Sequence, residues 1–236
     1  MGSIYLIRHG QASFGADDYD VLSPVGMRQS EALGQHLAQL GIRLDRCLAG
    51  NLRRQQDTAR LALQSMHDSG VQVPQLETDD AFNEFDADAV IRSLLPGLLP
   101  DEPEARHILR NGAQNRREFQ RLFALLIQRW HGGEHACEGC ESWHVFVERV
   151  EAGLHRVLDQ ASHGDNIAIF TSGGTITALL HRVIRITASQ AFELNWQIIN
   201  TSLSQLKFRG SEVALASFNS QAHVQLLKVP ELITYR

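Results

Sequence analysis

The sequence is poor in features that would direct the protein out of the cytoplasm. It contains only three cysteines, an odd number that suits a reducing compartment better than a disulfide framework. No apolar run approaches the roughly 18 residues that a membrane-spanning helix needs, and no charged segment followed by an apolar one forms a leader. We therefore expect a cytoplasmic protein that has no membrane partner.

Positive charge is also scarce. The net charge is −5, and no basic run interrupts the acidic balance, so we expect no nucleic-acid partner. The chain shows no internal repeat and no low-complexity tract. With 236 residues, 43% of them hydrophobic, it is long enough to bury one large core. These features favour a single domain over residues 1–236.

Strands and helices alternate along most of the chain. Short apolar runs predict strands at 4–7, 47–48, 71–77, 166–170, 202–208 and 212–218. Apolar residues at helical spacing predict helices that begin at Ser23-Pro24, begin near Leu52, and cover 119–130 and 146–161. This alternation favours an α/β fold, a three-layer α/β/α sandwich around a mostly parallel sheet.

The first predicted strand ends at a group of residues that suits phosphate chemistry. Arg8, His9 and Gly10 directly follow the apolar run 4–7. Ligands collect beyond the carboxyl ends of parallel strands, and a glycine lets the backbone turn closely against a ligand. A guanidinium can hold phosphate oxygens while an imidazole attacks phosphorus. The chain resembles the histidine phosphatase superfamily, also called phosphoglycerate-mutase-like, whose signature is Arg-His-Gly at this position.

A second segment, 51–59, is similar to the family pattern Ser-Asp-Leu-x-Arg-Ala-x-x-Thr-Ala. The resemblance places the second phosphate-binding arginine at Arg54. Arg54 would lie in the first turn of the helix that begins near Leu52, where backbone N–H groups already favour an anion. The neighbouring Arg53 is interpreted as an ordinary solvated charge.

A third segment, 81–86, resembles the part of the family that carries the proton donor, and Glu84 matches best. An ester leaving group needs a proton, and a carboxylic acid in a partly apolar pocket can supply it. Phe82 and Phe85 flank Glu84 and are expected to help raise its pKa. Asp86 is the next candidate. The remaining acidic residues nearby are Asp79, Asp80 and Asp88.

The fourth segment departs from the family. Members carry a second histidine after a late strand, whereas this chain has Ser172 there, followed by Gly173. A serine hydroxyl donates a hydrogen bond but brings no positive charge, so we expect reduced activity. We expect Ser172 and Gly173 to bind phosphate, with help from the N-terminus of the next helix. If Ser172 is a degraded second histidine at an open pocket mouth, Ser172→His should raise hydrolysis, which is the favoured outcome. If the site is rebuilt around serine, the larger ring would crowd the phosphate and activity would fall.

Residues from about 87 to 140 interrupt the alternation, and the resemblance implies a helical cap insertion there. The cap's end and the residues after it contain His131, His135, Cys137, Cys140 and His144. A Cys-x-x-Cys pair with histidines has the spacing of a zinc site or a redox pair. A loop that leads into the next helix through Glu141-Ser142 is the favoured interpretation, so no metal and no cofactor are expected.

The resemblance thus implies a phosphatase that hydrolyses a phosphomonoester, either a small metabolite or a phosphoprotein. His9 would form a phosphohistidine intermediate, and Glu84 would donate the proton. Phosphoglycerate mutase activity is not favoured, because Gln11 and the residues after it lack the Glu-Ser and asparagine of that branch. The alternative is a degenerate, non-catalytic member that binds a phosphorylated ligand or a protein partner.

Overall fold

A computed structural model describes residues 1–13, 20–112, 114–133 and 137–235. The chain divides into two compact units. The first unit consists of Met1–Glu84 and Val150–Arg236, and the second consists of Phe85–Arg149. The insertion predicted at 87–140 lies within the second unit.

The first unit is built around a six-stranded mixed sheet with the order β3-β2-β4-β1-β5-β6. Its strands are β1 (Gly2–Arg8), β2 (Arg46–Ala49), β3 (Leu76–Thr78), β4 (Asn166–Thr171), β5 (Leu203–Arg209) and β6 (Glu212–Ser220). Strands β1 to β4 run parallel to one another. Strand β5 pairs antiparallel with both β1 and β6. The predicted mostly parallel α/β sheet is confirmed.

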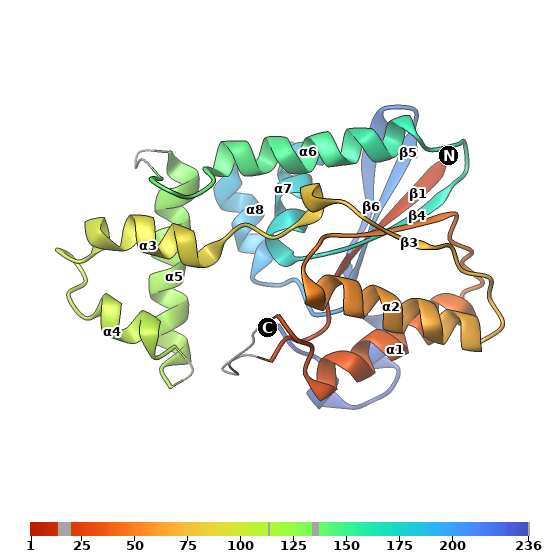
Figure 1. Cartoon of the computed structure of the whole chain (residues 1–236), viewed down its shortest axis with the longest axis horizontal. Helices are drawn as coiled ribbons and strands as arrows, with labels where there is room; N and C mark the ends of the chain where they lie inside the picture. Colours follow the sequence, from red (N-terminus) through yellow and green to blue (C-terminus); the bar gives the residue numbers. More distant parts are fainter. Residues whose placement is uncertain (14–19, 113, 134–136, 236) are drawn as a thin grey trace. The chain divides into compact units, whose positions relative to one another are not determined.

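Helices cover both faces of this sheet (Figure 1). On one face lie α1 (Pro24–Gln39) and α2 (Arg53–Asp68), whose Leu33 and Met66 pack with Ile7 of β1 in one buried cluster. On the other face lie α7 (Gly173–Val183) and the second part of α6 (Trp143–Asp159). Both faces are covered, so neighbouring residues of β1 such as Leu6 and Ile7 are both fully buried.

Short elements complete the first unit. They are the 3₁₀ helices η1 (Asp80–Phe82) and η2 (Pro230–Leu232) and the helices α8 (Ala188–Asn195) and α9 (Ala222–Gln225). The predicted helix start is confirmed at α1, where the Ser23 side chain accepts a hydrogen bond from the Gly26 N–H at 3.0 Å. The strand predicted at 71–77 is largely wrong. Only 76–78 pair with β2, because Pro74 has no N–H for a ladder.

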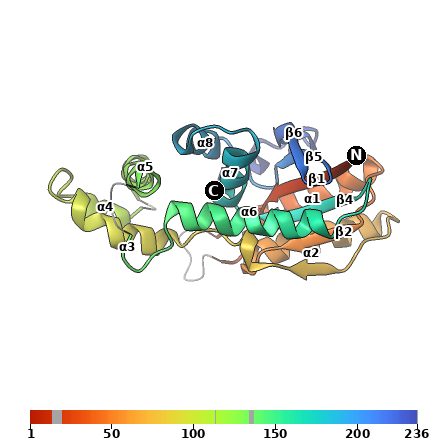
Figure 2. The same cartoon turned by 90° about the horizontal axis from the view of Figure 1, so that it is seen from above.

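The second unit is helical. It contains α3 (Ala87–Leu98), α4 (Ala105–Arg110), α5 (Arg116–Gly132) and the beginning of α6, drawn in Figure 2 from a second direction. Four aromatic side chains, Phe85, Trp130, Trp143 and Phe146, form its centre, with ring centroids 4.5 to 5.9 Å apart. Among the described residues, no helix is both long enough and apolar enough to span a membrane.

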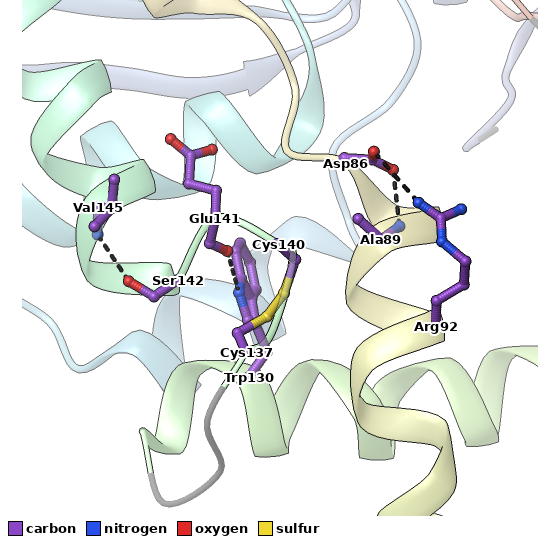
Figure 3. Close-up of a disulfide and its surroundings, with 9 residues drawn as sticks. All are labelled: Asp86, Ala89, Arg92, Trp130, Cys137, Cys140, Glu141, Ser142 and Val145. Atoms are coloured by element: carbon purple, nitrogen blue, oxygen red, sulfur yellow. Dashed lines mark hydrogen bonds and ion pairs between the residues drawn. A yellow bond between two sulfur atoms is a disulfide. The ribbon is translucent and has the colours of Figure 1, made fainter.

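Cys137 and Cys140 form a disulfide, with their Cα atoms 5.5 Å apart (Figure 3). The favoured interpretation of this segment as an ordinary loop did not anticipate this bond. Its predicted role as the lead into a helix holds, because the Ser142 hydroxyl accepts from the Val145 N–H at the start of α6. His135 lies outside the described residues. Among those described, no three His, Cys, Asp or Glu side chains are grouped so as to hold a metal ion.

Candidate active site

The carboxyl ends of β1 and β4 lie side by side and bring two predicted segments together. Arg8 pairs with Thr171 as the last residues of the two strands. The ladder continues for one more bond, in which the His9 N–H donates to the Thr171 carbonyl at 2.8 Å. Ser172 follows directly, so it lies beside His9 at the edge of the sheet where a ligand is expected.

The His9 ring is held between a carbonyl group and a guanidinium. Its Nδ1 is 2.7 Å from the Gly10 carbonyl oxygen, and its Nε2 accepts from the Arg54 Nε at 3.2 Å. A carbonyl only accepts, so the proton is on Nδ1 and the lone pair is on Nε2. Burial holds the pKa of His9 well below 6.5, and the charges of Arg54 and Arg8 lower it further against the Gly10 hydrogen bond. The ring is therefore neutral at pH 7.

Side chains from two other segments fix the backbone around His9. The Asn200 amide donates to the His9 carbonyl at 3.0 Å, and the Gly10 N–H donates to the Thr58 hydroxyl at 2.9 Å. A Cβ atom on Gly10 would lie only 2.6 Å from the Gly26 carbonyl oxygen, so a larger residue does not fit there. Sequence analysis did not identify Asn200 as part of the site.

Arg54 lies in the first turn of α2, as predicted, and is buried. Its Nη1 is 2.7 Å from the Asp20 carboxylate, which also accepts from the Arg53 backbone N–H at 2.7 Å. Asp20 thus caps α2, whose N-cap residue Leu52 makes no side-chain cap bond, and Asp20 was not predicted. The Arg53 side chain is 60% exposed and pairs with Asp57, in agreement with its interpretation as a surface charge.

The Glu84 carboxylate lies at the N-terminus of α7, where it accepts from the Gly174 N–H at 3.0 Å. The Thr175 hydroxyl donates to the Asn83 carbonyl at 3.0 Å and ties the preceding residue to the same helix. Glu84 is therefore attached to the helix that begins directly after Ser172. Its role as proton donor remains a prediction.

Two of the competing acidic residues have structural partners. Asp79 accepts from the Ala81 N–H at the start of η1 and pairs with Arg156 at 2.9 Å. Asp86 accepts from the Ala89 N–H at the start of α3 (Figure 3). These contacts explain both residues as helix caps.

Ser172 is fully buried, and its Oγ accepts from the Gln55 Nε2 at 2.8 Å. The premise of an open pocket mouth at this position is therefore wrong. Gln55 is the most consequential residue that sequence analysis missed. The signal was present, because the family pattern has alanine after the arginine and this chain has glutamine.

Gly173 and Arg8 lie close together. A Cβ atom on Gly173 would lie 2.7 Å from the Asn195 Oδ1 and 3.8 Å from the Arg8 Nε. The Arg8 Nη1 donates to the Ile198 carbonyl. The first turn of α7 and the Arg8 side chain thus lie close together, and the roles of both as phosphate ligands remain predictions.

The sequence model of the histidine phosphatase superfamily (branch 1) matches residues 4–91 and 106–221 of the chain. These two ranges cover most of the protein and contain Arg8, His9, Arg54, Glu84 and Ser172. The chain belongs to this superfamily. The second range ends at residue 221, directly after β6, so the match includes the whole sheet except the first two residues of β1.

The chain is similar to bacterial proteins that are named as phosphoglycerate mutases. A 2,3-bisphosphoglycerate-dependent phosphoglycerate mutase of Rhizobium etli (strain CIAT 652) is 28% identical over 204 residues, covering 82% of this chain and 85% of the mutase. The enzyme of the same name from Methylobacterium sp. (strain 4-46) is 36% identical over 187 residues, covering 75% and 78%.

Solved structures share the fold at lower identity. Phosphoserine phosphatase from Entamoeba histolytica in complex with 3-phosphoglyceric acid superposes with a TM-score of 0.64 at 17% identity, covering 95% of this chain and 100% of that chain. This likeness shows the fold, while the superfamily match and the relatives named as mutases support an enzyme.

Proposed function

We propose that the protein is a phosphatase that hydrolyses a phosphomonoester, either a small metabolite or a phosphoprotein, through a phosphohistidine on His9. The observation that carries this proposal is the state of the His9 ring. Its Nδ1 proton is held by the Gly10 carbonyl, so the Nε2 lone pair faces the Arg54 guanidinium. A buried, neutral imidazole with an oriented lone pair becomes the nucleophile when the Arg54 N–H turns from Nε2 to a phosphoryl oxygen.

In the first step, the His9 Nε2 attacks phosphorus while the bond between phosphorus and the ester oxygen breaks. Arg8 and Arg54 hold the phosphoryl oxygens with charge-assisted hydrogen bonds. Glu84, protonated at the start of the step, gives its proton to the leaving oxygen. The products are phosphohistidine, an alcohol and the Glu84 carboxylate.

In the second step, water attacks the phosphohistidine. The Glu84 carboxylate takes a proton from the attacking water, the bond between phosphorus and Nε2 breaks, and inorganic phosphate forms. Glu84 returns to its protonated form and His9 to its neutral form. No metal or cofactor enters this sequence of steps.

A second candidate function is favoured by Ser172. A neutral side chain at the second histidine position supplies no charge to the transition state, which suits a non-catalytic member that binds a phosphorylated ligand or partner. The nucleophile geometry at His9 favours the first candidate, because a binding protein needs no oriented lone pair.

Hydrolysis of a panel of phosphomonoesters, including phosphorylated metabolites and phosphopeptides, tests the proposal. We expect turnover of at least one substrate by the wild-type protein and none by His9→Ala. Titration with inorganic phosphate by calorimetry gives the second readout. Phosphate binding that depends on Arg54, without hydrolysis of any substrate, would favour the non-catalytic candidate instead.

A further inference from the structure

Two consecutive residues of α2 donate hydrogen bonds to two neighbouring strand ends. The Arg54 Nε donates to the His9 Nε2 at 3.2 Å, and the Gln55 Nε2 donates to the Ser172 Oγ at 2.8 Å. The proposed function assigns the first pair and leaves the second without a role. Gln55 and Ser172 are both fully buried, and the Gln55 Oε1 finds no hydrogen-bond partner among the described residues. Burying this amide therefore costs free energy, which suggests that its donor bonds serve a purpose.

The orientation of the Gln55 amide is fixed by its surroundings. Its Nε2 also donates to the Phe82 carbonyl at 3.2 Å. A carbonyl only accepts, so the nitrogen and not the oxygen must face Phe82 and Ser172. The amide oxygen points to Gly50, where a Cβ atom would lie only 2.1 Å away. Gly50 thus provides the room that this orientation needs.

The orientation of Gln55 determines what Ser172 can do. Because the Ser172 Oγ accepts from Gln55, its own hydrogen remains to be donated. Ser172 makes no side-chain cap bond to α7, and Gln55 is its hydrogen-bond partner within the described ranges. The ladder between β1 and β4 places Ser172 beside His9. Ser172 is therefore next to the phosphoryl group that His9 would accept.

We propose that Gln55 and Ser172 act as a pair, in which Gln55 positions the Ser172 hydroxyl to donate a hydrogen bond to an oxygen of the transferring phosphoryl group. The pair is a neutral donor at the position where the family has a cationic one. Gln55 is a positioning residue, and Ser172 touches the substrate. This inference rests on the proposed phosphatase function and specifies how its site works without the second histidine.

The pair also changes the expected effect of restoring the histidine. Ser172 is buried against Gln55, so an imidazole at position 172 would collide with the Gln55 amide. Ser172→His alone is therefore expected to lower hydrolysis. Removing Gln55 as well would make room, and Gln55→Ala/Ser172→His should exceed Ser172→His alone by about tenfold or more.

A double-mutant cycle tests the pair in the full-length protein. Gln55→Met keeps the volume of the side chain but cannot donate, and Ser172→Ala removes the hydroxyl. Each should lower kcat/KM for a phosphomonoester by about 10- to 100-fold, as expected for one hydrogen bond to a charged group. The double variant should fall no further than either single variant. Ser204→Ala removes another fully buried serine hydroxyl, in β5, and is the matched control.

The outcomes separate this inference from the function on which it rests. Unchanged kinetics in Gln55→Met, or additive losses in the double variant, would overturn the positioning role. Thermal unfolding of each variant identifies losses due to misfolding, and Gln55→Leu then replaces Gln55→Met. If the wild-type protein hydrolyses nothing, the phosphatase proposal fails. Calorimetric titration of the same variants with inorganic phosphate then tests whether Gln55 positions the Ser172 hydroxyl. Equal, non-additive losses of phosphate affinity would support it, and unchanged affinity would overturn it.

Discussion

The two units of the protein differ in what they bury. The first unit buries polar side chains, among them Gln55, Thr171, Ser172 and Asn200, and hydrogen bonds tie each of these to its surroundings. In the second unit, the buried side chains of the described residues are apolar or aromatic. Buried polar groups cost free energy unless they are paired, and apolar packing specifies position less strictly. The contrast indicates that hydrogen bonds fix the positions of buried polar side chains in the first unit. The second unit is held together by apolar and aromatic packing.

The largest effect on stability should come from the aromatic centre of the second unit. Phe146 is fully buried and contacts Phe85, Trp130 and Trp143. Phe146→Ala should destabilise this unit by about 3–5 kcal/mol. Hydrogen exchange should show lost protection in α3 and α5, while the sheet keeps its protection. Val145→Ala, at a neighbouring residue that is 51% exposed, is the control. Equal losses in both units would contradict the division.

The next effect concerns chemistry in the first unit. Arg54→Ala removes a guanidinium from the His9 ring and from the phosphate, and kcat/KM should fall by about 100- to 1000-fold. Arg53→Ala is a close control, because its side chain is exposed one residue away on the same helix. Steady-state kinetics of both variants provide the test. Similar losses in the two would show that general charge, and not the contact with His9, is responsible.

A smaller effect is expected from acid. Burial and the nearby His36 lower the pKa of His223 to about 4 from 6.5. The unfolded chain therefore takes up this proton first as the pH falls, so the stability present above pH 6.5 is lost on the way to pH 4. The loss at about pH 5 is about 2 kcal/mol.

His223→Gln should reduce this pH dependence, because glutamine does not titrate and can still donate to the Thr201 hydroxyl. Urea unfolding at several pH values measures the slope. His67→Gln, at an exposed histidine of the first unit, should leave the slope unchanged. An equal slope in the wild-type protein and His223→Gln would contradict the role of the buried ring.

The smallest effect is expected on the surface of the second unit. Arg121 contacts Glu102 and Glu118 there, and its side chain is 44% exposed. Solvent screens such pairs, so Arg121→Ala should leave the denaturation midpoint nearly unchanged. A shift as large as that of Phe146→Ala would mean that this unit, too, depends on polar contacts.

The sequence predicts the fold of the first unit well, because local signals coincide with tertiary structure there. Ser23 and Pro24 mark the start of α1, and the apolar run before Arg8 is β1. The strand at 71–77 fails because apolar residues alone do not reveal whether a partner strand is reached. The disulfide between Cys137 and Cys140 also escapes, because spacing alone does not distinguish a bond from a loop.

The sequence identifies the main candidate residues of the site, but it does not identify the side chains that hold them in position. Arg8, His9 and Arg54 belong to motifs that can be read along the chain. Asp20 and Asn200 belong to none, and their contacts arise only when distant segments meet. Sequence patterns identify groups that carry chemistry more readily than the groups that orient them.

Trapping the covalent intermediate tests the central claim most directly. The protein is mixed with a phosphomonoester that it hydrolyses, denatured within milliseconds in alkali, and digested for mass spectrometry. We predict one added phosphoryl group on the peptide that contains His9, stable in alkali and lost in acid, and none in His9→Ala. Turnover in which no phosphoryl group reaches His9, or in which it resides on another residue, would contradict the account.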